Sequence, residues 1–184
     1  MGTNDLFILT GAPGAGKTAV LDAVGDGVRR VGEPAREVLA ELRAVGDTRT
    51  HDRDWAEFVG LLLERSIRKH QKAAGWAGPV LFDRGVPDCV AYATVLDVDP
   101  EPSVRAARTC RYNTDVLVLE PWEEIYSTDD ERTMSFADPL AFHEVLVDAF
   151  DRSGYTLMAI PKGSVQDRAA FVLDFLERRS GRHP

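Results

Sequence analysis

The chain has 184 residues, of which 44% are hydrophobic and 28% charged, an ordinary composition for one globular domain spanning residues 1–184 with a sizeable core. A formal net charge of −8 speaks against a general binder of nucleic-acid polymers, which would need a basic surface, but a backbone-lined loop can still bind a small phosphate ligand. No apolar run is long enough to span a bilayer, the N-terminus lacks the basic region of a signal peptide, and the two widely spaced cysteines fit a reducing compartment, so we expect a cytoplasmic protein.

Short apolar runs alternate with amphipathic stripes along the chain. In chain order the pattern predicts a strand at 6–9, a helix at 19–24, a strand at 28–31, helices at 35–45 and 54–74, a strand at 80–83, helices at 87–96 and 103–112, a strand at 116–119, a helix at 140–153, a strand at 156–160 and a final helix from 165. Asp54, Ser103 and Ser164 are the expected helix N-caps. Arg29 and Arg30 indicate that the second strand lies at a sheet edge, where charge is tolerated. Strands that alternate with helices indicate a parallel sheet with right-handed crossovers.

One motif lies between the first predicted strand and the first predicted helix. It fits the P-loop (Walker A) pattern G-x-x-x-x-G-K-[ST] in full and consists of Gly11, Ala12, Pro13, Gly14, Ala15, Gly16, Lys17 and Thr18. The glycines let several backbone N–H groups converge on phosphate oxygens, beside the positive end of the following helix. Lys17 would reach the β- and γ-phosphates of a nucleotide, and Thr18 would offer its hydroxyl to magnesium. The competing interpretation is a plain glycine-rich turn.

Asp83 ends the predicted strand at 80–83, and Arg84 follows directly after it. The carboxyl ends of strands in open α/β sheets border the crevice where ligands bind. Asp83 would hold magnesium there, directly or through water; the alternative is that it caps the next helix. Arg84 would clamp a transferring phosphoryl group or the substrate, and its alternative is a surface arginine paired with an acid.

Two further candidates follow other predicted strands. Glu33 lies after the second strand, where a carboxylate could accept a proton from an attacking hydroxyl, or could simply be an acid favoured by the N-terminal dipole of the next helix. Arg132 belongs to a polar, irregular segment, residues 120–139, which we expect to be a lid that carries this arginine to the triphosphate. The alternative for Arg132 is a solvated, charged helix start.

The segments that carry a family resemblance span nearly the whole chain in order and lie at residues 7–18, 33–37, 82–88, 121–132 and 154–165. They include the P-loop, Glu33-Pro34-Ala35-Arg36-Glu37, Asp83-Arg84-Gly85 with Asp88, Pro121-Trp122, and Pro161-Lys162-Gly163-Ser164-Val165. Together they resemble the predicted AAA-type ATPase and nucleoside-kinase-like P-loop family. That family includes the ribosylnicotinamide kinase domain of a bacterial NAD-biosynthesis regulator.

The resemblance implies a nucleoside- or adenylate-kinase-like α/β fold, the three-layer P-loop NTPase fold, with a five-stranded parallel sheet of order 2-3-1-4-5. It implies that Asp83 and Arg84 lie beside the phosphates and that Arg132 belongs to a lid. It also implies that the base of the nucleotide is bordered by Lys162, Gly163, Ser164 and Val165.

These features favour an enzyme that uses ATP and Mg²⁺ to move the γ-phosphoryl group to a hydroxyl of a small, nucleoside-like acceptor. Lys17 and magnesium would hold the phosphates, while Arg84 and Arg132 would stabilise the charge that spreads in transfer. Glu33 or Asp83 would take the proton of the acceptor. The alternative function is a nucleotide-dependent regulatory module, using ATP or GTP, without a small-molecule acceptor. The GTPase marker Asn-Lys-x-Asp does not occur in the sequence, which favours ATP.

Overall fold

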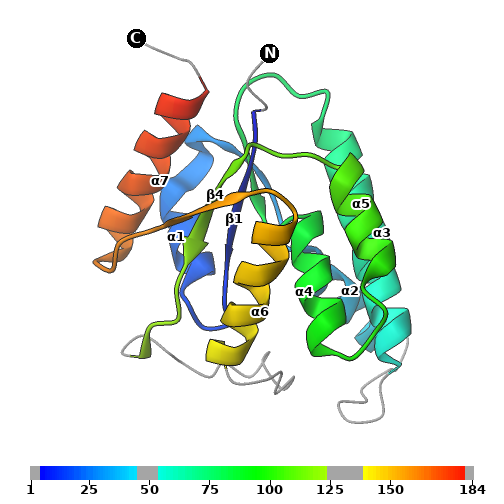
Figure 1. The fold of residues 1–184 in the computed structure, drawn as a ribbon. Coiled ribbons are helices and arrows are strands. Elements are labelled where there is room, and N and C mark those ends of the chain that lie inside the picture. The colour runs from blue at the N-terminus through cyan, green and yellow to red at the C-terminus, as the bar shows by residue number, and fades with distance from the viewer. Residues whose placement is uncertain (1–4, 45–53, 124–138, 181–184) are drawn as a thin grey trace.

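Figure 1 shows the computed structural model, which describes residues 5–44, 54–123 and 139–180, as a sheet between two layers of helices. The strands are β1 (Leu6–Gly11), β2 (Arg29–Val31), β3 (Val80–Asp83), β4 (Asp115–Leu119) and β5 (Thr156–Ala159). All neighbouring strands are parallel, and their order is β2-β3-β1-β4-β5. The predicted fold class and strand order are therefore confirmed, as is the edge position of β2.

The helices form the two outer layers of the fold. They are α1 (Lys17–Val24), α2 (Pro34–Ala44), α3 (Trp55–Ala73), α4 (Val86–Val95), α5 (Glu101–Thr109), α6 (Pro139–Arg152) and α7 (Val165–Arg179), and the short 3-10 turn η1 (Gly25–Gly27) follows α1. In Figure 1, α1 and α7 lie together on one side of the sheet, and α2 to α6 lie on the other. Among these described helices, none is both long and apolar enough to cross a membrane.

The central strands have apolar side chains on both faces, which is why they are continuous apolar runs in the sequence. In β1, Leu6 and Ile8 pack into the core on the side of α2 to α6, and Phe7 and Leu9 pack into the core on the side of α1 and α7. Each fully buried side chain of this size contributes about 1.5–3 kcal/mol. The strand that leads into the P-loop is thus held firmly from both faces.

Two of the predicted helix caps are confirmed. Asp54 caps α3, because its side chain accepts a hydrogen bond from the N–H of Glu57 at 3.0 Å. Ser164 caps α7 and exchanges hydrogen bonds with Asp167 in a reciprocal capping box. The start of α7 lies beside the P-loop, since Arg168 donates to the carbonyl of Ala15, and it is defined by its own local sequence.

The predicted cap at Ser103 is wrong. Ser103 lies inside α5 and is buried, because the helix begins earlier, at Glu101. The side chain of Asp99 accepts a hydrogen bond from the N–H of Glu101 at 3.0 Å, and Pro102 in the first turn fixes a helical φ angle. The signal that defines this start was thus the aspartate and prolines before Ser103.

The carboxyl ends of β1 and β3 lie side by side at the edge of the sheet where the P-loop begins. Leu9 of β1 is opposite Asp83 of β3, and Gly11 is opposite Leu119 of β4. A Cβ atom on Gly11 would lie 2.4 Å from the carbonyl oxygen of Leu119, and the φ of Gly11 is 150°. Glycine is therefore required at this position, and it lets the chain leave the sheet close to β4.

Candidate functional site

The P-loop curls between β1 and α1 as the motif predicts. Gly14 and Gly16 have φ angles of 84° and 81°, which side chains other than that of glycine rarely adopt, and the N–H of Ala15 bonds to the carbonyl of Ala12 at 3.3 Å across Pro13. Among the described residues, no side chain caps the N-terminus of α1. The first N–H groups of α1 are therefore available to an anion at the end of the helix dipole.

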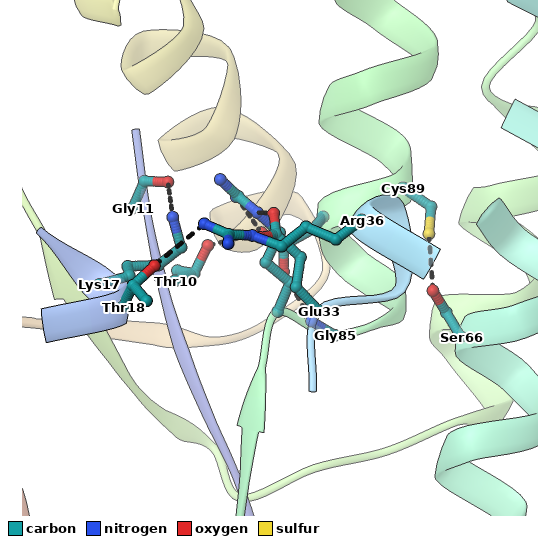
Figure 2. Close-up of polar contacts among 11 residues, drawn as sticks. Thr10, Gly11, Lys17, Thr18, Glu33, Arg36, Ser66, Gly85 and Cys89 are labelled. Atoms are coloured by element: carbon teal, nitrogen blue, oxygen red, sulfur yellow. Dashed lines mark hydrogen bonds and ion pairs between the residues drawn. The ribbon is translucent and has the colours of Figure 1, made fainter. Parts of the chain in front are cut away.

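Lys17 is buried, and its amine folds back over the loop. Its Nζ donates to the carbonyl oxygen of Gly11 at 3.5 Å, a weak bond (Figure 2). Burial, and then the charge of Arg84, lower the pKa of Lys17 to about 8. A phosphate group would supply the strong acceptor that Gly11 does not, and its negative charge would raise this pKa again.

The next candidate residue is Asp83, at the end of β3. Its carboxylate is buried, and Oδ1 has no hydrogen-bond partner among the described residues. Burial first, and the charge of Glu33 second, raise the pKa of Asp83 to about 6. Asp83 does not cap α4, whose N-cap is Gly85, and the carboxylate that accepts the Gly85 N–H is that of Asp88. The capping interpretation of Asp83 is therefore wrong.

An unpartnered carboxylate oxygen at this sheet edge fits a magnesium ligand, since Mg²⁺ prefers oxygen donors. Within the described ranges, no group of three or more His, Cys, Asp or Glu residues is placed to hold a metal ion by itself. Asp83 and Thr18 line the same cleft, so a cation held there would complete its coordination with water and phosphate oxygens.

Arg84 is held in place from several sides. Its side chain is only 3% exposed, its Nε donates to Glu33 Oε1 at 2.9 Å, and its Nη1 donates to Asp88 Oδ1 at 2.9 Å. The guanidinium also lies over the rings of Tyr92 and Phe142, at 5.5 and 5.7 Å from their centroids. The arginine is paired with acids, but it is not on the surface as the competing interpretation supposed.

The backbone of Arg84 is strained, with a φ angle of 67° in the left-handed region. Such a conformation costs a residue with a side chain about 1–3 kcal/mol and persists when the surroundings enforce it. The N–H of Arg84 bonds to the carbonyl of Leu9 at 3.1 Å, and Gly85 follows with no room for a side chain, since its Cβ would lie 2.5 Å from Ile8. The turn therefore fixes the direction in which Arg84 leaves β3.

Glu33 lies directly before α2 and is bound by two arginines. Its Oε1 accepts from Arg84, and its Oε2 accepts from the Nε of Arg36 at 2.9 Å. Burial alone would raise the pKa of Glu33, but the positive charges of Arg84 and Lys17 and the two hydrogen bonds outweigh burial and lower it to about 2. A carboxylate in this state holds its charge firmly and is a weak proton acceptor.

A cleft of about 300 Å³ opens beside the P-loop and is lined by Thr18, Leu21, Asp22, Arg30, Val31, Gly32, Glu33, Arg36 and Asp83. Arg36 extends from α2 to this cleft, and its Nη2 donates to the hydroxyl of Thr18 at 3.0 Å (Figure 2). The cleft therefore brings together three predicted site residues, Thr18, Glu33 and Asp83, and also Arg36, for which no role was predicted.

The sequence patterns assign no role to Asp88 or Arg36, and the structure places both in the site network. Asp88 is buried and accepts hydrogen bonds from Thr10, Arg84 and the Gly85 N–H. Available signals were the acid in the first turn of α4 and the arginine three residues after Glu33, one helical turn along.

A second, much smaller hollow lies next to the P-loop on the side of α7 and is lined by Ala15, Leu119, Glu120, Trp122, Ile160, Pro161, Lys162 and Arg168. Lys162 Nζ and the guanidinium of Arg168 lie 5.7 and 5.6 Å from the ring centroid of Trp122. Arg168 also donates to the carbonyl of Ala15 at 3.3 Å. Of the four residues expected to border a base, Lys162 lines this hollow. Gly163, Ser164 and Val165 form the turn and first residue of α7 and are not among its lining residues.

Arg132 and residues 124–138 of the expected lid lie outside the described residues. The placement of Arg132 beside the phosphates of a nucleotide therefore stays a prediction.

Solved structures with a similar fold include two of the NadR protein. One, in complex with NR, has a TM-score of 0.74 and 17% identity, and the alignment covers 98% of this chain and 53% of that chain. The other, with NAD and AMP-PNP, has a TM-score of 0.71 and 15% identity, covering 99% and 51%. The chain thus spans about half the length of the NadR chains. Thymidylate kinase from Candida albicans has a TM-score of 0.61 and 10% identity, covering 96% and 92%.

Identities this low establish a shared P-loop kinase-like fold and no more. No curated protein matches the chain in sequence. A family model described as an AAA domain matches residues 6–168, which is most of the chain. The chain therefore belongs to this AAA-domain family, and its predicted resemblance to P-loop nucleoside-kinase-like proteins is confirmed.

Proposed function

We propose that this protein binds ATP with magnesium at the P-loop and transfers the γ-phosphoryl group to a hydroxyl of a small molecule held in the cleft beside Thr18. The observation that carries the proposal is the position of this cleft. Both candidate magnesium residues, Thr18 and Asp83, line a space of about 300 Å³, which is enough for a small molecule. A kinase needs such a second space next to the phosphates, whereas a nucleotide switch does not.

The phosphates of ATP would be held by the backbone N–H groups of the P-loop and by Lys17. Lys17 would exchange its weak bond to Gly11 for a charged bond to phosphate. Magnesium, when bound, supplies further neutralisation of the phosphate charge. The AMP-PNP in one NadR complex, an analogue of ATP, supports ATP as the nucleotide by analogy.

Glu33 would act by position rather than as a base. Both of its oxygens are engaged by arginines, and its low pKa makes it a poor proton acceptor. Its role would be to hold Arg84 and Arg36 in fixed directions at the cleft. Asp83, with its unpartnered Oδ1, is then the carboxylate left to face the metal and the acceptor hydroxyl. A loose phosphoryl-transfer transition state asks little of a base, so positioning is the larger contribution.

Arg84 would stabilise the negative charge that develops on the transferring group. Glu33 and Asp88 fix its side chain before any ligand binds, so little reorganisation is needed during reaction. Arg132 would add a second positive charge from the expected lid, in a segment outside the described residues. Together, the two arginines would supply most of the side-chain charge that stabilises the transferring phosphoryl group.

The test is an acceptor panel. Purified protein with saturating ATP and Mg²⁺ is incubated with nucleosides, ribosides and other small polyhydroxy compounds, and ADP and phosphorylated product are measured. A kinase should form ADP in proportion to the amount of one acceptor, and Lys17→Ala, shown by circular dichroism to be folded, should abolish this formation of ADP. Nucleotide binding without acceptor-dependent ADP from any compound would contradict the proposal and favour a nucleotide-dependent regulatory module.

A further inference from the structure

The inference starts from one hydrogen bond across the mouth of the cleft. The Nη2 of Arg36, in the first turn of α2, donates to the hydroxyl oxygen of Thr18, in the first turn of α1, at 3.0 Å. The same guanidinium donates through Nε to Glu33 Oε2 at 2.9 Å. Glu33 in turn is held by Arg84. The partners of Arg36 thus include Glu33, which is itself firmly held, and Thr18 at the P-loop.

The hydroxyl of Thr18 cannot serve Arg36 and magnesium equally well. A threonine hydroxyl binds a cation through an oxygen lone pair, at about 2.0–2.1 Å for Mg²⁺. In the structure a lone pair of this oxygen already accepts from a guanidinium, and that group carries a positive charge. A divalent cation at Thr18 would therefore find one of the two lone pairs of this oxygen already used, and would lie next to a like charge.

We propose that Arg36 competes with magnesium for the Thr18 hydroxyl, so that metal binding releases the terminal amino group of Arg36 into the cleft while Glu33 keeps its Nε in place. This inference rests on the proposed magnesium–nucleotide site. It makes Arg36 a positioning residue that links metal loading to the shape of the acceptor cleft. The Arg36 side chain, half exposed, lines that cleft and has room to turn.

If Arg36 competes with magnesium, its removal should affect nucleotide binding differently from the removal of an arginine that binds phosphate. Removal of a phosphate-binding arginine weakens nucleotide binding with or without metal. Removal of a competitor for Thr18 instead increases the factor by which magnesium strengthens nucleotide binding. Arg30 provides a matched control, since it lines the same cleft but its Nη1 donates to the carbonyl of Leu21.

The experiment measures the dissociation constant of AMP-PNP by isothermal titration calorimetry, with EDTA and with stepped Mg²⁺, for the wild type, Arg36→Met and Arg30→Met. Methionine keeps much of the stem and removes the charge and the donors. The magnesium factor, the ratio of the two dissociation constants, should rise about two- to tenfold in Arg36→Met, the range for one competing hydrogen bond. It should change by less than twofold in Arg30→Met.

The outcomes separate this inference from the proposed function. If magnesium does not strengthen AMP-PNP binding by the wild type, both are overturned. If it does, and Arg36→Met leaves the magnesium factor unchanged or lowers it, the inference alone is overturned. A double-mutant cycle adds a second readout: in a Thr18→Val background, which lacks the shared hydroxyl, Arg36→Met should no longer change the factor. Should Arg36→Met not fold, Arg36→Gln, which is also uncharged, takes its place in the same comparison.

Discussion

Two networks of ion pairs meet at α2, one buried under the site and one on the surface between α2 and α3. In the buried network, Arg84 is 3% exposed and joins Glu33 and Asp88, which are 12% and 2% exposed. In the surface network, Arg65 of α3 joins Glu37 and Glu41 of α2, which are 44% and 59% exposed. The chemical groups are the same, but the solvent around them differs.

Because their exposure to water differs, the two networks are expected to have different roles. A surface pair gains about 0–1 kcal/mol, since water screens the attraction and the side chains lose freedom. A buried pair loses so much hydration that a protein with apolar residues of the same volume in its place would often be as stable. Removing only one partner of the pair, however, leaves an uncompensated charge in the interior and is strongly destabilising. The surface network therefore fits a role in holding α2 against α3. The buried network, next to the P-loop and on a strained backbone, fits a functional role.

The largest expected effect is that of Asp88→Ala. It removes a partner of Arg84 and leaves Thr10 and the Gly85 N–H without their acceptor. We expect the free energy of unfolding to fall by about 3–5 kcal/mol. Urea denaturation measures it, with Asp148→Ala as the control, since Asp148 pairs with Arg152 at 2.9 Å on the exposed side of α6. Equal stability of the two variants would mean that burial of the network has no energetic consequence.

Asp83→Asn is expected to change the free energy of unfolding by a smaller amount, and to increase it rather than decrease it. Burial and Glu33 raise the pKa of Asp83 to about 6. A carboxyl whose pKa is higher in the folded state binds its proton more tightly when folded, so its contribution to stability falls as pH rises from about 4 to about 6. At pH 7, above both pKa values, the ionised group costs about 3 kcal/mol, since one pKa unit corresponds to about 1.4 kcal/mol.

Asp83→Asn should therefore stabilise the protein without ligand by up to about 3 kcal/mol at pH 7 and by much less at pH 4. Urea denaturation at the two pH values checks this, and magnesium titration of AMP-PNP binding should show a weaker metal response. A variant that is less stable than the wild type at pH 7 would indicate that Asp83 has a favourable partner in the folded protein.

The smallest effect is expected on the surface, for Arg65→Gln. The variant breaks the pairs with Glu37 and Glu41, so the free energy of unfolding should fall by less than about 1 kcal/mol, and by less still in high salt. AMP-PNP affinity should stay within twofold of the wild-type value. A loss of affinity tenfold or larger would show that the surface network, and not only the buried one, sets the geometry of the site.

Some parts of the fold and of the candidate site are predictable from the sequence, and others are not. The P-loop and the alternation of strands with helices are local patterns that are visible in a single sequence, whereas the strand order was implied only by the family resemblance. Asp83 is a candidate because of its place at the end of an apolar run, which is also a local pattern. The partners of Asp88 were not found, because Thr10 lies 78 residues away and reaches Asp88 only through the pairing of β1 with β3.

The burial of Arg84 was not predictable for a related reason. Its sequence neighbours give no sign of the two rings that cover it, Tyr92 from α4 and Phe142 from α6. The role of Arg36 likewise depends on how close α2 comes to α1, which neither helix encodes alone. Long-range packing, rather than local propensity, determines these parts of the site. The placement of Arg132 remains a prediction from the sequence alone.

The central claim, that the P-loop binds a magnesium–triphosphate through Lys17, is tested most directly by calorimetric titration of AMP-PNP with Mg²⁺ into wild-type protein and Lys17→Ala. A charged hydrogen bond of this kind contributes about 1.5–3 kcal/mol. We predict that the wild type binds the nucleotide and that Lys17→Ala, with an unchanged circular dichroism spectrum, binds it at least tenfold more weakly. Equal affinity of the two folded proteins would contradict the account.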